Sequence, residues 1–240
     1  MRAIFSFYVN NNRQPMRKSR GLAMRAICAC LVQVCLIFMM AAVVHGEELA
    51  VSRFKLEGLN GWTPKSFKDQ TEYRLQQEDG RIVVQATSHA AASGMVKQLE
   101  FDPAKYRYLR WSWKIADTVK GGDEKTKAGD DYAARLYVVF PGLFFWQTKA
   151  INYIWANKLP KGETIPNAFT ANAMMVAVES GPSLAGWWLQ EERDILADYK
   201  QLFGEDPPEA GAVAMMTDTD NTGASAVAWY GDIVISTSPR

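Results

Sequence analysis

The chain has 240 residues, of which 48% are hydrophobic and 22% charged, and its 27 basic and 26 acidic residues give a net charge of +1. Residues 1–46 hold six of the basic residues and no acid, so the rest of the chain has 21 basic and 26 acidic residues, a net charge of about −5. This net-acidic part of the chain lacks the basic surface that neutralises phosphates, and this excludes nucleic acid as a partner.

Residues 1–46 are predicted to be a signal peptide. A basic segment precedes the apolar run 26–44, and small residues up to Gly46 offer a cleavage site. The alternative is an uncleaved anchor, because a run of about nineteen apolar residues is close to the length of a spanning helix. The prediction is an exported protein, periplasmic or secreted, with no membrane insertion after signal cleavage.

Residues 47–240 are predicted to form a single domain, because no repeat or low-complexity tract divides them. All three cysteines, Cys28, Cys30 and Cys35, fall inside the apolar run 26–44. The predicted domain therefore has no thiol for a disulfide bond, a metal site or nucleophilic catalysis.

Period-two alternation predicts short strands along this domain. The first is 81–87, and in 107–116 Leu109, Trp111, Trp113 and Ile115 alternate with polar residues. In 131–140 the expected core face carries Tyr132, Ala134, Leu136, Val138 and Phe140, and the opposite face carries Asp131, Arg135 and Tyr137. Further strands are expected at about 148–156, 171–179, 211–217 and 225–236, the last with Val227, Trp229, Ile233 and Ile235 on one face opposite Tyr230 and Asp232.

One helix is predicted near residues 189–203. Ile195, Leu196, Tyr199, Leu202 and Phe203 follow a helical period, and Gly204 stands where a helix ends. Many short strands with a single helix and no βαβ rhythm favour a mostly β fold. We expect an antiparallel jelly-roll-like β-sandwich of the galactose-binding-like kind.

Several catalytic chemistries have no residues to support them. His89 is the only histidine beyond residue 46, and a triad or a zinc site needs more than this residue offers. No glycine-rich phosphate loop joins a strand to a helix, so nucleotide binding is not predicted. Carboxylates remain, and Asp131, Glu192 and Asp232 are the candidates for an acid and base pair in a glycoside hydrolase or lyase.

The segment 215–223, MMTDTDNTG, contains oxygen ligands spaced as in the first half of a calcium loop. Asp218, Asp220 and Thr222 are the candidate metal ligands, and calcium is the ion that they would suit. Trp229 stands where an EF-hand requires glutamate, which excludes that motif. The alternative is an ordinary hairpin turn between two strands, with no cofactor.

All eight tryptophans lie beyond residue 46, a composition suited to stacking on sugar rings. Trp111, Trp113 and Trp229 fall on predicted core faces. The clusters 144–146 and 187–188 fall in predicted loops, where an exposed contact patch or burial against neighbouring elements are both open.

Long segments of the domain resemble the signature blocks of the bacterial family named domain of unknown function 3047. They are LRWSWK at 109–114, KAGDDYAARLYVVF at 127–140, NYIWA at 152–156, ERDILADY at 192–199, MTDTDNT at 216–222 and AWYGDI at 228–233. The resemblance covers nearly the whole chain beyond residue 46. It implies an exported bacterial protein with a fold similar to jelly-roll domains that include carbohydrate-binding modules, and it implies no established activity.

The leading functional hypothesis is a noncatalytic binding domain for a glycan or another polar envelope ligand. The residues expected to line its groove are Arg110, Lys114, Asp131, Arg135, Tyr137, Asn152 and Asp232. Two alternatives stay open: the carboxylate-based hydrolase or lyase, and an envelope scaffold that binds no small ligand and whose polar blocks specify the fold.

Overall fold

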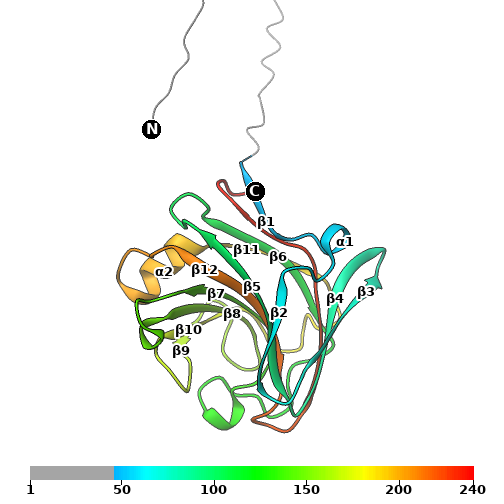
Figure 1. The fold of residues 1–240 in the computed structure, drawn as a ribbon. Helices are drawn as coiled ribbons and strands as arrows, with labels where there is room; N and C mark the ends of the chain where they lie inside the picture. Colours follow the sequence, from blue (N-terminus) through cyan, green and yellow to red (C-terminus); the bar gives the residue numbers. More distant parts are fainter. Residues whose placement is uncertain (1–45) are drawn as a thin grey trace, which may run out of the picture. The chain divides into compact units, whose positions relative to one another are not determined.

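The computed structural model describes residues 46–240, so the predicted signal peptide, apart from Gly46, lies outside the described residues. Strands dominate the described chain, and they form two seven-stranded sheets, called sheet A and sheet B. Figure 1 shows the two sheets with the helices at their margins. The predicted mostly β sandwich is therefore confirmed.

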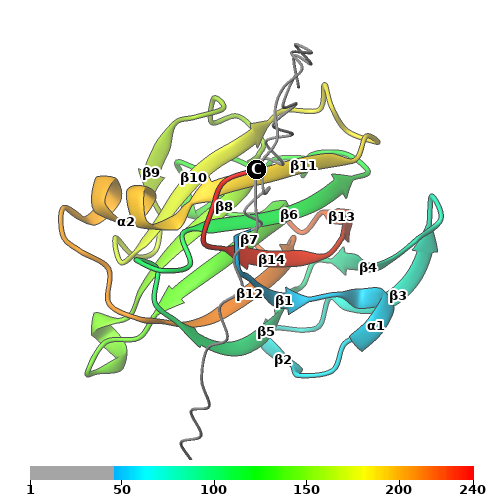
Figure 2. The same cartoon turned by 90° about the horizontal axis from the view of Figure 1, so that it is seen from above.

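Sheet A is antiparallel throughout. Its strands are β1 (Glu48–Ser52), β3 (Glu72–Glu78), β4 (Arg81–His89), β6 (Tyr108–Ile115), β11 (Leu189–Asp194), β13 (Ser225–Tyr230) and β14 (Ile233–Ser236). Strand β6 pairs with β11, β13 and β14, while β1 pairs with β14. Figure 2 shows β11, β6, β14 and β1 lying side by side.

Sheet B has the order β2-β5-β12-β7-β8-β10-β9. Its strands are β2 (Trp62–Lys68), β5 (Ala92–Phe101), β12 (Ala210–Asp218), β7 (Tyr132–Phe140), β8 (Lys149–Ala156), β10 (Ala173–Ser180) and β9 (Thr164–Pro166). Strands β8 and β10 run parallel, and the chain between them contains β9, which pairs antiparallel with β10. This crossover is the one departure from antiparallel pairing among the described strands.

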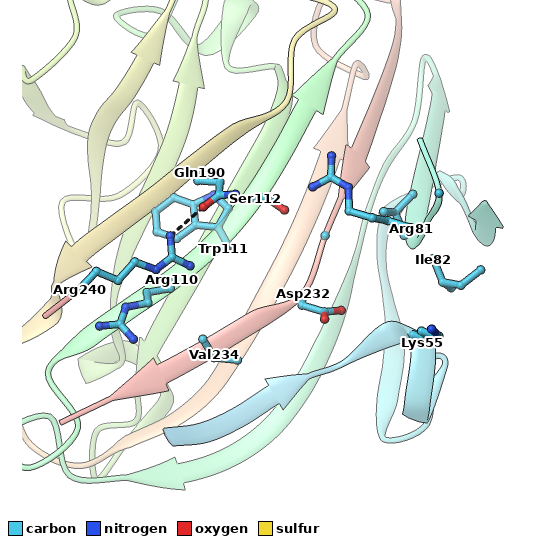
Figure 3. A pocket seen from close by; sticks show the side chains of 13 residues that line it. Lys55, Arg81, Ile82, Arg110, Trp111, Ser112, Gln190, Asp232, Val234 and Arg240 are labelled. Carbon is cyan, nitrogen blue, oxygen red and sulfur yellow. Dashed lines mark hydrogen bonds between the residues drawn. The ribbon is translucent and has the colours of Figure 1, made fainter. Parts of the chain in front are cut away.

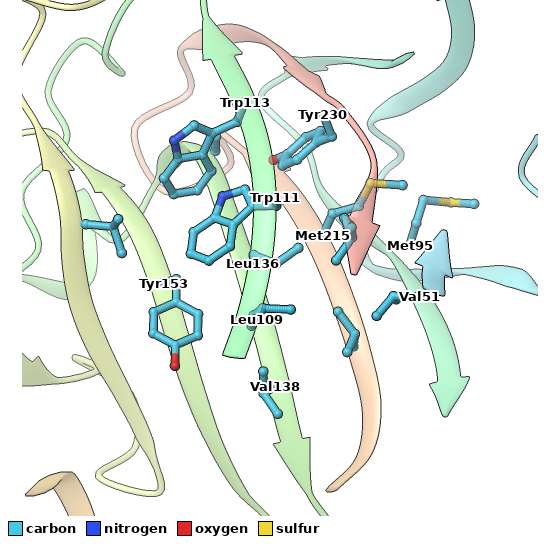
Figure 4. Close-up of a cluster of buried hydrophobic side chains, with 14 of the residues drawn as sticks. Val51, Met95, Leu109, Trp111, Trp113, Leu136, Val138, Tyr153, Met215 and Tyr230 are labelled. Carbon is cyan, nitrogen blue, oxygen red and sulfur yellow. The ribbon is translucent and has the colours of Figure 1, made fainter. Parts of the chain in front are cut away.

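The core lies between the two sheets, and the alternation in β6 explains how it forms. Leu109, Trp111, Trp113 and Ile115 are buried, as predicted for this strand. The rings of Trp111 and Tyr153, from opposite sheets, have centroids 5.4 Å apart. Figure 4 shows both rings among the buried hydrophobic side chains of the core. Burying each such side chain stabilises the fold by about 1.5–3 kcal/mol.

Helix α2 (Ile195–Phe203) confirms the predicted helix but begins later than expected, because 189–194 forms strand β11. The side chain of Asp194 accepts a hydrogen bond of 3.0 Å from the N–H of Ala197 and caps the first turn. Gly204 ends the helix with a φ of 72°, a conformation that favours glycine. The short helices α1 (Phe54–Glu57), η1 (Lys127–Gly129) and η2 (Phe145–Gln147) were not predicted.

Strand β13 faces the opposite way from the prediction. Tyr230 is fully buried in the core with Ala226 and Ala228, whereas Trp229 lies on the outer face with the Lys114 ammonium 4.5 Å from its ring centroid. The pattern misled because the inward positions carry small alanines and the outward ones carry larger apolar residues.

The segment between β12 and β13 is not a hairpin turn. β12 belongs to sheet B and β13 to sheet A, so residues 219–224 cross from one sheet to the other. Within residues 46–240, no helix is long and apolar enough to cross a membrane.

Candidate functional site

A β-bulge in β7 determines which side chains reach the outer face of sheet B, the face turned away from sheet A. Arg135 of β7 pairs with Met216 of β12, and Tyr132 pairs with Asp218, so β7 has one more residue than β12 between these pairs. As a result the Arg135 guanidinium lies 4.6 Å from the ring centroid of Tyr132. The prediction that placed Tyr132 with the core face of 131–140 is wrong, because alternation does not reveal a bulge.

Arg135 and Asp218 form a buried ion pair on this face. Their exposed fractions are 5% and 1%, and Nη2 of Arg135 donates to Oδ2 of Asp218. Burial raises the pKa of Asp218 well above its usual range; Arg135 opposes this, and Asp131 and Asp130 add to it. Burial, the largest single influence, would lower the pKa of Arg135, but Asp218, Tyr137, Asp130 and Tyr132 together outweigh it and raise that pKa.

A groove of about 540 Å³ lies over this pair. Arg135 and Tyr137 line it from β7, and Asn152 lines it from β8. These three residues share the outer face because Tyr137 is the direct register partner of Asn152 on the neighbouring strand. The structure thus brings three of the predicted ligand-binding residues together.

Three residues that line this groove each have a buried polar atom with no hydrogen-bond partner: Nε of Arg135, Oδ1 of Asn152 and Oδ1 of Asp218. Asn152 is only 1% exposed, so its oxygen is removed from bulk water. Leaving a buried donor or acceptor unsatisfied costs about 1–3 kcal/mol. Most buried polar groups in proteins are paired, so three exceptions among the residues of one groove are unusual.

An acidic cluster stands at one end of the groove. The carboxylates of Asp131, Asp218 and Asp220 each offer an oxygen within 4.8 Å of the others. Asp131, fully buried, precedes β7 and accepts hydrogen bonds from the backbone N–H groups of Asn221 at 3.1 Å and Thr222 at 2.7 Å. The cluster contains two predicted metal ligands, Asp218 and Asp220, joined by Asp131.

Thr222, the third predicted metal ligand, has a different role in the hydrogen bonding. Its backbone N–H donates to Asp131, and its hydroxyl oxygen accepts a hydrogen bond of 3.2 Å from the N–H of Ala224. Thr222 therefore shapes the loop, while Asp131 supplies the third carboxylate.

The remaining predicted binding residues lie on sheet A. Arg110 and Asp232 line a second hollow, of about 480 Å³, on the outer face of that sheet (Figure 3). The two predicted residues in this hollow already have partners: Arg110 donates to Glu192 at 2.6 Å, and Asp232 accepts from the N–H of Phe54 at 2.8 Å. Lys114 donates to Glu78. Because these groups are satisfied, the groove of sheet B is the stronger candidate for a site.

The three acids named as catalytic candidates have separate partners. Asp131 holds the loop at 221–222, and Asp232 caps the start of α1 at Phe54. Glu192 accepts hydrogen bonds from Arg110 and from the backbone N–H of Arg240. Asp131 adjoins a strand of sheet B, Glu192 belongs to sheet A and Asp232 lies between β13 and β14, so each acid is held by a different part of the fold.

Two aromatic residues that line the groove were not among the residues predicted to bind a ligand. Phe67 in β2 and Phe169 in the segment after β9 line the groove, with exposed fractions of 68% and 56%. A lone phenylalanine in the polar strand 62–68 was the available signal for Phe67. Phe169 has no such signal, because only the fold brings its loop beside β7 and β8.

Comparison with protein families gives one match, to the family described as "Protein of unknown function (DUF3047)", over residues 60–234. No curated protein matches in sequence.

Among solved structures, a family 29 carbohydrate-binding module is 12% identical, with 80% of this chain and 94% of the module covered and a TM-score of 0.39. The K1 adhesin domain of Lys-gingipain from Porphyromonas gingivalis is 13% identical, with 81% and 100% covered and a TM-score of 0.40. The xylan-binding module CBM15 is 10% identical, with 82% and 99% covered and a TM-score of 0.40. At these TM-scores the likenesses carry no argument about a ligand.

Proposed function

Because this chain belongs to the DUF3047 family of proteins of unknown function, its function has to come from its own geometry, and we propose a noncatalytic binding domain that holds a glycan in the groove of sheet B. The observation that carries the proposal is the pair of unpartnered atoms Arg135 Nε and Asn152 Oδ1. One is a donor and the other an acceptor. A hydroxyl group can satisfy both kinds, since it donates one hydrogen bond and accepts two.

The pocket walls support a glycan over a purely polar small molecule. Phe67 and Phe169 present exposed rings to the groove, and such rings stack on the apolar faces of sugars. Tyr137 adds a phenol to the same lining. The nearby carboxylates of Asp218 and Asp220 disfavour an anionic ligand, so the glycan is a neutral one.

The groove is also pre-organised for binding. Arg135 forms an ion pair with Asp218, and its guanidinium lies over the ring of Tyr132. These two contacts hold the Nε–H group in place. Fixed polar groups spare a ligand the entropy of ordering flexible ones, and this raises affinity for a matching hydroxyl pattern.

The test is binding of the purified protein to an array of neutral bacterial and plant glycans, followed by calorimetry on each hit. The decisive variant is Asn152→Leu, which keeps the side-chain volume but removes the unpartnered oxygen. We expect it to weaken binding by about ten-fold or more, equivalent to at least about 1.4 kcal/mol. Its melting temperature should stay near that of the parent, because Oδ1 has no intramolecular partner and the side-chain contact that is lost is one hydrogen bond to Tyr137.

Gln85→Leu is the matched control, since it makes the same kind of change on sheet A, where Gln85 pairs with Trp229. It should leave glycan binding unchanged. Absence of any glycan hit, or a folded Asn152→Leu protein that binds like the parent, would overturn the proposal and favour the scaffold reading.

We also propose export to the periplasm or the cell exterior, on the basis of the basic and apolar segments of residues 1–46. Cell fractionation with a C-terminal tag tests this, together with mass determination of the mature chain. Recovery in the cytoplasm at full length would contradict it.

A further inference from the structure

We propose that Asp131, Asp218 and Asp220 bind a divalent cation of the calcium type at the end of the groove. This site is independent of the glycan proposal, because its oxygens are other than Arg135 Nε and Asn152 Oδ1. Calcium takes oxygen ligands at about 2.3–2.6 Å, so oxygens on opposite sides of the ion stand up to about 5 Å apart. The three carboxylates, within 4.8 Å of one another, fit around one such ion.

Some carboxylate oxygens of the cluster have lone pairs that accept no hydrogen bond and are available to a cation. Oδ1 of Asp218 is buried and has no hydrogen-bond partner, although its other oxygen is held by Arg135. Asp131 accepts three hydrogen bonds, two from Asn221 and one from Thr222. A carboxylate has about four acceptor positions, so Asp131 keeps one for a cation.

The region around the cluster has more acidic than basic side chains, and a dication would balance this excess of negative charge. Asp130 lines the same groove as Asp218 and Asp220, so four carboxylates lie in this region, at 130, 131, 218 and 220. The cations that contact this region are Arg135, bonded to Asp218, and Lys68, whose ammonium lies 3.1 Å from the backbone oxygen of Asp220. A bound dication would bring the four acids and two bases to neutrality, which lowers the cost of burying them.

The chain segments that meet here explain what the ion would do. Asp131 lies just before β7, Asp218 ends β12 and Asp220 stands in the crossing to β13. A cation bound by all three would tie the start of one strand of sheet B to the segment that passes to sheet A. Its remaining coordination positions would face the groove, where Asp218, Asp220 and Asn221 form part of the wall.

The test is calorimetric titration of chelator-treated protein with calcium chloride, with magnesium chloride as a comparison, alongside melting curves in calcium and in chelator. We expect saturable binding of one calcium ion and a higher melting temperature in calcium. Magnesium should bind more weakly, because it requires a near-ideal octahedral shell and parts with its waters reluctantly.

Asp220→Asn is the variant of choice, because Asp220 is half-buried and its side chain accepts only from the neighbouring Asn221. The variant should fold and lose about ten-fold or more in calcium affinity, since ligand charge sets affinity in such sites. The control Asp206→Asn changes a side chain that is 82% exposed and should bind calcium as the parent does. Absence of calcium binding by the parent, or unchanged affinity in Asp220→Asn, would overturn the proposal. Glycan binding measured in chelator keeps this outcome separate from that of the proposed function.

Discussion

The carboxylate of Asp131 accepts a hydrogen bond of 2.7 Å from the backbone N–H of Thr222, a residue 91 positions further along the chain. This contact explains why Asp131 is fully buried. Asp131 therefore holds the crossing between the two sheets in place from a buried position.

Asp131→Ala should therefore destabilise the fold. Three N–H donors of Asn221 and Thr222 lose their acceptor, and we expect a loss of about 2–4 kcal/mol in the free energy of unfolding. Urea unfolding followed by fluorescence measures this. Asp206→Ala, at an exposed position, should change stability by less than about 0.5 kcal/mol. An equally small effect of Asp131→Ala would mean that the loop is held by other contacts.

The Arg135–Asp218 pair should show strong coupling. Removing one partner leaves an uncompensated buried charge, so Arg135→Met or Asp218→Leu alone should cost about 3–5 kcal/mol. The double variant should be more stable than either single variant, because neither charge is left behind. A double-mutant cycle by urea unfolding measures the coupling energy. Additive single effects would show that the two side chains do not depend on each other.

Tyr230→Phe should weaken the region of the bulge. The Tyr230 hydroxyl donates to the carbonyl of Met216 at 2.7 Å and accepts from the N–H of Arg135 at 3.3 Å. Losing it leaves these groups unsatisfied in the core, at a cost of about 1–3 kcal/mol. The comparison is Tyr108→Phe, whose hydroxyl has no hydrogen bond within residues 46–240 and whose loss should have little effect. Equal melting temperatures for the two variants would refute this role.

Phe67→Ala and Phe169→Ala should weaken glycan binding without unfolding the protein. Both rings are more than half exposed, so stability should change by less than about 0.5 kcal/mol, while the lost stacking lowers affinity by about three- to ten-fold. Calorimetry with the best glycan hit measures this. Phe144→Ala removes a ring that is 54% exposed but lies outside the groove lining, and it should bind normally. Normal binding by both groove variants would exclude stacking as a source of affinity.

Asp194 gives the fold a pH dependence on the acid side. Burial, the largest single influence, raises the pKa of Asp194, but the Arg107 guanidinium and the N–H of Ala197 together hold it below its ordinary value of 3.8. A depressed folded-state pKa means stability that is present above the unfolded pKa and lost as the pH falls through the folded pKa. The side chain is 25% exposed and Arg107 38%, so the contribution is about 1 kcal/mol or less.

Asp194→Asn keeps the helix cap and removes the charge, so it isolates this contribution. Its unfolding free energy should fall below that of the parent at neutral pH, and the gap should close as the pH drops below the ordinary value of 3.8. Urea unfolding at successive pH values measures the gap. A gap that persists in acid would point to lost packing.

Some of this fold can be read from the sequence because local pattern and tertiary role agree. The alternation from Leu109 to Ile115 identifies both the core face and the polar face of β6. In β13 the same rule fails, since Ala226 and Ala228 fill tight inward positions and Trp229 packs under Lys114. Side-chain size alone does not tell which face of a strand is buried.

The sequence predicts residues of the candidate site, but it does not predict which of them lie together in one groove. Arg135, Tyr137 and Asn152 stand out as polar groups in apolar strands, and the structure places all three in one groove. Arg110 and Lys114 have the same pattern, yet they belong to the other sheet. Alternation shows that a face is polar, and only strand pairing shows which polar faces adjoin.

The pairing of β1 with β14 has a consequence for how the chain is made. Within residues 46–240, β1 pairs with no strand but β14, so β1 stays unpaired until residues 233–236 have been synthesised. Sheet A is incomplete while residues 233–236 are still in the ribosome. Sheet A therefore gains its β1–β14 edge only after residues 233–236 have left the ribosome.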